Sequence, residues 1–154
     1  MYGIPCWNVK KGHGSFLTFE FGEPHIEIGK VFESASALGF KHKKRSIYVH
    51  GTWHLWIYMC AWHIFYNNRE ICHSESDDLT INRTCGFLNG QSLLNVEIDQ
   101  NKSTIFKFEF GGLLKTIPYS DKETNDTWML YCPDEQILSL QSNGQFKLTK
   151  SNKE

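Results

Sequence analysis

The stretch from residue 52 to residue 66 constrains the fold more than any other part of the chain. Apolar and aromatic side chains fill both of its alternating positions. One set is Trp53, Leu55, Ile57, Met59 and Ala61, and the other is Trp56, Tyr58, Cys60, Trp62 and Ile64. A strand that is apolar on both faces lies inside a sheet that is covered on each side. The sequence therefore predicts one long central strand over residues 52–66.

Shorter strands are predicted on both sides of this stretch. Residues 15–22 and 25–32 alternate apolar and polar side chains, as half-buried strands do, and the turn between them at residues 22–24 favours a hairpin. Residues 34–45, with the basic run at 41–45, are interpreted as a solvated loop. Further strands are predicted over residues 92–99, 104–111, 113–118, 127–132, 136–141 and 145–149, forming a meander.

One helix is predicted over residues 74–88, after a tight turn at Asn67-Asn68. Residues 74–77 resemble a capping box, and Ile81, Cys85 and Leu88 form one apolar stripe at helical spacing. Asn89-Gly90 supplies the stop. The chain is thus expected to be one α+β domain over residues 1–154, mostly antiparallel β, with a strongly curved sheet or partly open barrel and one central helix. Residues 1–14 and 150–154 are expected to be irregular.

The composition points to a globular protein. The chain has 40% hydrophobic residues and a formal net charge of -1, which gives no global field for nucleic acid or an anionic membrane. The most apolar stretch is too short to span a bilayer as a helix. An odd number of cysteines, five, favours reduced thiols, and the first residues lack the apolar run of a signal peptide. We therefore expect a cytoplasmic protein with no nucleic-acid or membrane partner.

Seven histidines and five cysteines raise the question of a metal site. Cys60 and His63 stand at an odd offset on a strand, so their side chains point to opposite faces and cannot share an ion. His50 and His54 share a face but lie about 13 Å apart on an extended chain, unless Gly51 bends it sharply. The spacing therefore predicts no metal ligands, and no cofactor motif is present.

No catalytic residue is predicted either. Cys72 lies before the helix, but acidic neighbours would raise its pKa, and Ser15 leads into a strand where a nucleophile elbow would link strand to helix. Four strand carboxylates occupy the outward positions of alternating patterns and are expected to face solvent. They are Glu20, Glu27, Glu97 and Glu109.

Residues 12–24, 50–58, 73–78 and 89–91 together resemble a family of small conserved bacterial proteins with no established activity. The resemblance runs over most of the chain in order. It implies a bacterial, cytosolic, single-domain protein and transfers no catalytic residue.

Two functional hypotheses remain open, and neither fixes the oligomeric state. The first is a non-enzymatic protein-binding domain, in its sharpest form an immunity-type protein whose acidic helix start pairs with a basic toxin domain. The alternative is a small-molecule-binding or hydrolytic domain with a pocket along the aromatic strand between Trp53 and Trp62. The candidate binding residues are Trp53, His54, Trp56, Tyr58, Trp62, His63, Glu75, Asp77 and Asp78.

Overall fold

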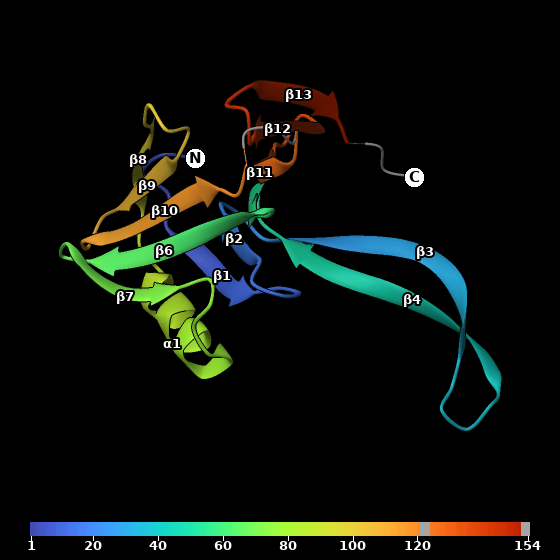
Figure 1. Ribbon diagram of the computed structural model, residues 1–154. Coiled ribbons are helices and arrows are strands. Elements are labelled where there is room, and N and C mark those ends of the chain that lie inside the picture. Colours follow the sequence, from blue (N-terminus) through green and yellow to red (C-terminus); the bar gives the residue numbers. More distant parts are fainter. Residues whose placement is uncertain (121–123, 152–154) are drawn as a thin grey trace.

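The computed structural model describes residues 1–120 and 124–151, and it consists of two antiparallel sheets, a separate two-stranded hairpin and one helix (Figure 1). The first sheet has six strands in the order β1-β2-β5-β11-β12-β13. Their bounds are β1 Cys6–Lys11, β2 Leu17–Phe21, β5 Trp53–Ile57, β11 Asp126–Tyr131, β12 Gln136–Gln141 and β13 Phe146–Lys150.

The second sheet has five strands in the order β7-β6-β10-β9-β8. Their bounds are β6 Cys60–Tyr66, β7 Arg69–His73, β8 Leu93–Ile98, β9 Thr104–Phe108 and β10 Gly112–Pro118. Every pairing in both sheets is antiparallel. The mostly antiparallel α+β architecture is thus confirmed, as an open pair of sheets.

Aromatic side chains from the two sheets meet in the core. Phe19 of β2 stacks on Phe108 of β9 with ring centroids 6.0 Å apart. Trp128 of β11 meets Phe106 of β9 edge-on, and its indole N–H donates to the Thr104 hydroxyl at 2.9 Å. All five residues are buried. These contacts hold the two sheets face to face around one hydrophobic core.

The stretch at residues 52–66 is two strands in different sheets, which corrects the prediction of one central strand. Leu55 and Ile57 are buried in β5, whereas Cys60, Trp62 and Ile64 are buried in β6. The buried set changes from odd to even positions where the chain crosses between sheets, at Tyr58 and Met59. Apolar residues at both parities therefore reflect two half-buried strands rather than one strand buried on both faces.

The helix α1, Asp78–Leu88, lies against β1 and β7, so it does not cover a central strand. Its N-cap is Asp77, whose carboxylate accepts from the backbone N–H of Thr80 at 3.0 Å, so the helix begins a few residues later than predicted. The apolar stripe of Ile81, Cys85 and Leu88 is buried, as predicted. The expected stop is also confirmed, with Asn89 as C-cap.

Strands β3, His25–Ala35, and β4, Lys41–His50, pair only with each other in a two-stranded ribbon. Figure 1 shows this ribbon, here called the arm, extending away from the two sheets. The predicted hairpin of residues 15–22 with 25–32 is therefore wrong, because β2 pairs with β1 and β5. The predicted loop at residues 34–45 is confirmed only for residues 36–40, because residues 34–35 belong to β3 and residues 41–45 to β4.

Three further expectations can be compared with the structure. Residues 1–14 are not all irregular, because β1 lies within them, and β13 extends to Lys150. Residues 152–154 of the expected irregular end lie outside the described residues. The predicted strands of the second half are present, but β8–β10 belong to one sheet and β11–β13 to the other.

No helix in the described part of the chain has the length and apolarity that crossing a membrane requires.

Candidate functional site

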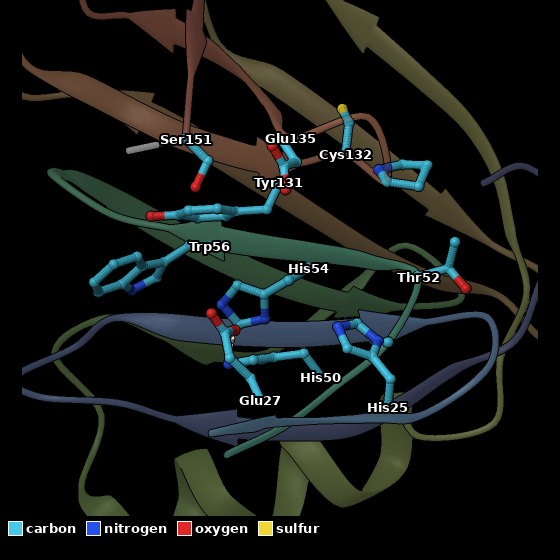
Figure 2. A pocket seen from close by; sticks show the side chains of 12 residues that line it. His25, Glu27, His50, Thr52, His54, Trp56, Tyr131, Cys132, Glu135 and Ser151 are labelled. Atoms are coloured by element: carbon cyan, nitrogen blue, oxygen red, sulfur yellow. Dashed lines mark ion pairs between the residues drawn. The ribbon is translucent and has the colours of Figure 1, made fainter. Parts of the chain in front are cut away.

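A pocket of about 470 Å³ lies between the base of the arm and the outer face of the first sheet. Figure 2 shows His54, Trp56 and Tyr131 of the sheet and His25, Glu27 and His50 of the arm around the same cavity. The lining combines aromatic surface with imidazole and carboxylate groups. Such a combination is typical of sites that bind small molecules.

Glu20 of β2 organises the polar side of this pocket. Its side chain is almost fully covered, and the residue is only 1% exposed. One carboxylate oxygen, Oε1, lies 2.8 Å from Nδ1 of His54 and 3.1 Å from Nδ1 of His50. The other oxygen, Oε2, accepts the backbone N–H of Gly51 at 2.9 Å. One buried carboxylate thus holds both imidazoles and the chain between them.

These hydrogen bonds determine the protonation of the cluster. Burial raises the pKa of Glu20, but the hydrogen bonds from His54, Gly51 and His50 outweigh it and hold this pKa below its ordinary value. Glu20 is therefore ionised near neutral pH and can only accept hydrogen bonds. Both histidines must then carry a proton on Nδ1, which leaves Nε2 of each neutral ring with a lone pair.

Further groups surround the two imidazoles. The rings of His50 and His54 have centroids 4.8 Å apart, and the ring of Tyr131 lies 5.4 Å from that of His54. Nε2 of His50 lies 3.9 Å from a carboxylate oxygen of Glu27. Burial raises the pKa of Tyr131, so its hydroxyl keeps its proton and can donate a hydrogen bond.

Gly51 explains how one short segment delivers both histidines. A Cβ at this position would clash with the backbone of Phe21, 2.8 Å from its nitrogen and closer still to its carbonyl oxygen. The chain can therefore end β4 at His50, pass directly against β2 and start β5 only because residue 51 is a glycine. The register of β2 on β5 then places Glu20 directly opposite His54.

The structure corrects the sequence expectations for these residues. Glu20 does point away from the hydrophobic core, as its position in the strand predicts, but His50, His54 and the base of the arm cover it. The expectation that it faces solvent is therefore wrong. The condition attached to His50 and His54, a sharp bend at Gly51, is fulfilled. A glycine next to one histidine and three residues before another was the only local signal of this bend.

The other aromatic candidates from residues 52–66 lie apart from one another in the structure. Trp53 is half-buried and packs against the hydrophobic core. Tyr58 packs on Phe16 and Trp56, with ring centroids 4.5 and 5.1 Å away. Trp62 is fully buried, and its indole N–H donates to the carbonyl of Ser15 at 2.6 Å. Among the aromatic candidates, only Trp56 lines the pocket.

The remaining candidates lie outside the pocket. His63 of β6 lies on the partly exposed side of the second sheet, with Nδ1 3.1 Å from Glu70. Glu75, Asp77 and Asp78 stand at the start of the helix, where Asp78 forms a 2.6 Å ion pair with Lys11. Sequence reasoning thus found His54 and Trp56 but missed Glu20, His25, Glu27, His50 and Tyr131.

Comparison with known proteins finds no match among family models, among curated proteins or among solved structures. The chain is an open two-sheet antiparallel protein with a projecting arm and a carboxylate-bound histidine pair. The bacterial family resemblance stays a prediction.

Proposed function

We propose that the pocket binds a small polar molecule and that His50 and His54 are the groups that react with it, in a hydrolytic site. The observation that carries this proposal is the buried Glu20 carboxylate, bonded to both imidazoles beside an open cavity. Burying a carboxylate is costly unless it is fully hydrogen-bonded. Ionisable groups placed in a cavity in this way occur preferentially at functional sites.

The chemistry follows from the fixed Nδ1 protons. With Nδ1–H donated to Glu20, Nε2 is the basic nitrogen of each ring and can take a proton from water or from a ligand hydroxyl. The Glu20 charge stabilises the imidazolium that forms. The Tyr131 ring lies 5.4 Å from that of His54, and its protonated hydroxyl can donate to a negative charge that develops on a molecule in the pocket.

A fragment screen followed by NMR of the histidine and tryptophan side chains tests this function. Fragments that occupy the pocket should shift the ring signals of His50, His54 and Trp56 in the wild-type protein. His54→Asn should abolish this response, whereas His63→Asn, on the second sheet, should preserve it. Fragments that shift other side chains and ignore His54→Asn would exclude the pocket as the binding site.

A second candidate function, binding of a protein partner, is favoured by the arm. Ile26 and Val49 form one cross-strand pair and Ile28 and Ile47 the next, on the face of the ribbon opposite His25 and His50. These four side chains are 48 to 67% exposed. Exposed apolar patches mark interaction surfaces. The pattern supports the protein-binding hypothesis, of which a bacterial, cytoplasmic toxin-neutralising protein is the sharpest form.

The charges of the arm change the partner expected in that case. The outer half of β4 is basic, with Lys41, Lys43, Lys44 and Arg45 all exposed. A partner that covers the arm would thus present an acidic and apolar surface, whereas the helix start favours a basic one. Comparing partner binding by the wild-type protein with binding by a variant whose residues 29–46 are replaced by Asn-Gly separates these two docking modes.

A further inference from the structure

The geometry points to a divalent transition-metal site at Glu20, His50 and His54. This inference deepens the proposed function of the pocket and rests on it. One ligand atom from each of the three residues lies within 4.8 Å of the others. Two imidazole nitrogens and a carboxylate oxygen are ligands that zinc and its neighbours in the first transition row accept.

The hydrogen-bond distances resemble the edges of a coordination sphere. Two ligand atoms that bind one zinc ion at about 2.0–2.1 Å, at angles between square and tetrahedral, lie about 2.9–3.4 Å apart. The Oε1 atom of Glu20 lies 2.8 Å from Nδ1 of His54 and 3.1 Å from Nδ1 of His50. Small movements of the two rings would therefore bring one ligand atom of each residue within reach of a single ion.

The proton balance of this exchange is simple. Each neutral ring moves its proton from Nδ1 to Nε2, which frees the Nδ1 lone pair for the metal without a net change in charge. A ring that starts as imidazolium releases one proton to solvent on binding. Glu20, already ionised, binds the metal without losing a proton.

The surroundings are those of a reactive metal site rather than a structural one. Oε2 of Glu20 is fixed by the Gly51 N–H, so the ligand oxygen is oriented before any ion arrives. His50 and His54 line the cavity, so a water or a ligand in it would reach an ion held by these residues. Glu27, whose carboxylate oxygen lies 3.9 Å from Nε2 of His50, would accept a hydrogen bond from the N–H of this ring after a small approach. With the metal bound, Nε2 of each ring carries a proton, so a zinc-bound water would supply the nucleophile for hydrolysis in place of a histidine base.

Titration of the full-length, chelator-treated protein with Zn²⁺ by calorimetry, repeated with Co²⁺ by absorption spectroscopy, tests the site. We expect one ion per chain and visible Co²⁺ bands of a four- or five-coordinate site. His50→Asn and His54→Asn should each weaken Zn²⁺ binding about 100-fold or more, since loss of an outer-shell partner alone costs 10–100-fold. Glu20→Gln should weaken it similarly, with circular dichroism confirming the fold.

His63→Asn is the matched control, because His63 also pairs with a glutamate but on the second sheet. It should leave Zn²⁺ affinity and stoichiometry unchanged. Absence of one-to-one binding, or binding that survives His54→Asn and is lost in His63→Asn, would overturn the metal site. If fragments bind the pocket but the protein takes up no Zn²⁺, the metal site is refuted and the small-molecule function stands. If the protein takes up Zn²⁺ but no fragment binds, the small-molecule function is refuted and the metal site stands.

Discussion

At the scale of single residues, Glu20 decides the properties of the pocket. It accepts three hydrogen bonds, from His54, His50 and the Gly51 backbone, within a nearly closed environment. Its neighbours Phe19 and Phe21 pack in the hydrophobic core on the opposite face of β2. The same short strand therefore anchors the core on one side and the polar cluster on the other.

Glu20→Gln should destabilise the protein by about 1–3 kcal/mol at pH 7, because the neutral amide leaves one of the three N–H donors without an acceptor. The pKa of Glu20 in the folded protein lies below its ordinary value of 4.5. Its stabilising contribution is therefore present above pH about 4.5 and is lost as the pH falls through the folded-state pKa. Urea unfolding of both proteins at pH 7 and pH 3.5 measures the difference, which should shrink at the lower pH.

Glu97→Gln is the control for this comparison. Glu97 is exposed and pairs with Lys107 at 2.8 Å, so its replacement should leave stability nearly unchanged at both pH values. Equal effects of the two substitutions at pH 7 would contradict the special role of Glu20.

Gly51→Ala should destabilise the protein by about 2 kcal/mol or more, because the new Cβ meets the backbone of Phe21 rather than a flexible side chain. Gly86→Ala provides the contrast within the same chain. Gly86 lies in α1 with open space where its Cβ would be, so alanine should stabilise by about 0.5–1 kcal/mol. Thermal unfolding of the two variants tests the pair, and a wild-type melting temperature for Gly51→Ala would be incompatible with the close passage at β2.

At the scale of elements, the arm differs from the rest of the fold. Strands β3 and β4 pair with each other and join neither sheet. Apart from the pocket residues at its base, the arm exposes side chains on both faces. It therefore contributes little to the hydrophobic core and is available for contacts outside the domain.

Replacing residues 29–46 by Asn-Gly tests this separation. Ile28 and Ile47 are cross-strand partners, so a two-residue turn can join them and preserve the base of the arm with His25, Glu27 and His50. The free energy of unfolding should change by less than about 1 kcal/mol, because few of the deleted apolar side chains are buried. Zn²⁺ binding at the pocket should persist, while binding of an acidic protein partner should weaken, because the variant loses the basic half of β4 but keeps the apolar pairs Ile26/Val49 and Ile28/Ile47. Global unfolding of the variant, followed by circular dichroism, would show that the arm supports the core.

At the scale of the whole molecule, one hydrophobic core between the sheets encloses most of the cysteines. Burial raises the pKa of Cys6 and Cys60 to about 12 and that of Cys85 to about 11. At pH 8 the thiolate fraction of each is at most about one thousandth, so these thiols are poor nucleophiles in the folded protein. Cys132, by contrast, is partly exposed and lies beside the pocket.

Iodoacetamide labelling at pH 8, read by peptide mass spectrometry, should therefore modify Cys132 first. Cys6, Cys60 and Cys85 should react only after global unfolding in urea. Early labelling of Cys60 would indicate that the two sheets open locally where the chain crosses between them.

Local patterns determined much of the secondary structure. The alternation in residues 15–22, the helical stripe of Ile81, Cys85 and Leu88, and the turns at Asn67-Asn68 and Asn89-Gly90 each report short-range geometry, and the structure confirms them. The strands of the second half follow for the same reason. The sequence also determined that Cys60 and His63 diverge, because side-chain direction along a strand has a fixed period of two.

Only the tertiary structure decided which strands share a sheet and which side chains share a pocket. Strand pairing depends on contacts between segments far apart in the chain. The local pattern of residues 52–66 therefore predicted one strand, whereas β5 and β6 lie in different sheets and the chain crosses between them at Tyr58 and Met59. An outward-facing position is exposed only if nothing covers it, and the base of the arm covers Glu20. The glutamate and the two histidines, about 30 residues apart in sequence, meet because Gly51 passes against β2.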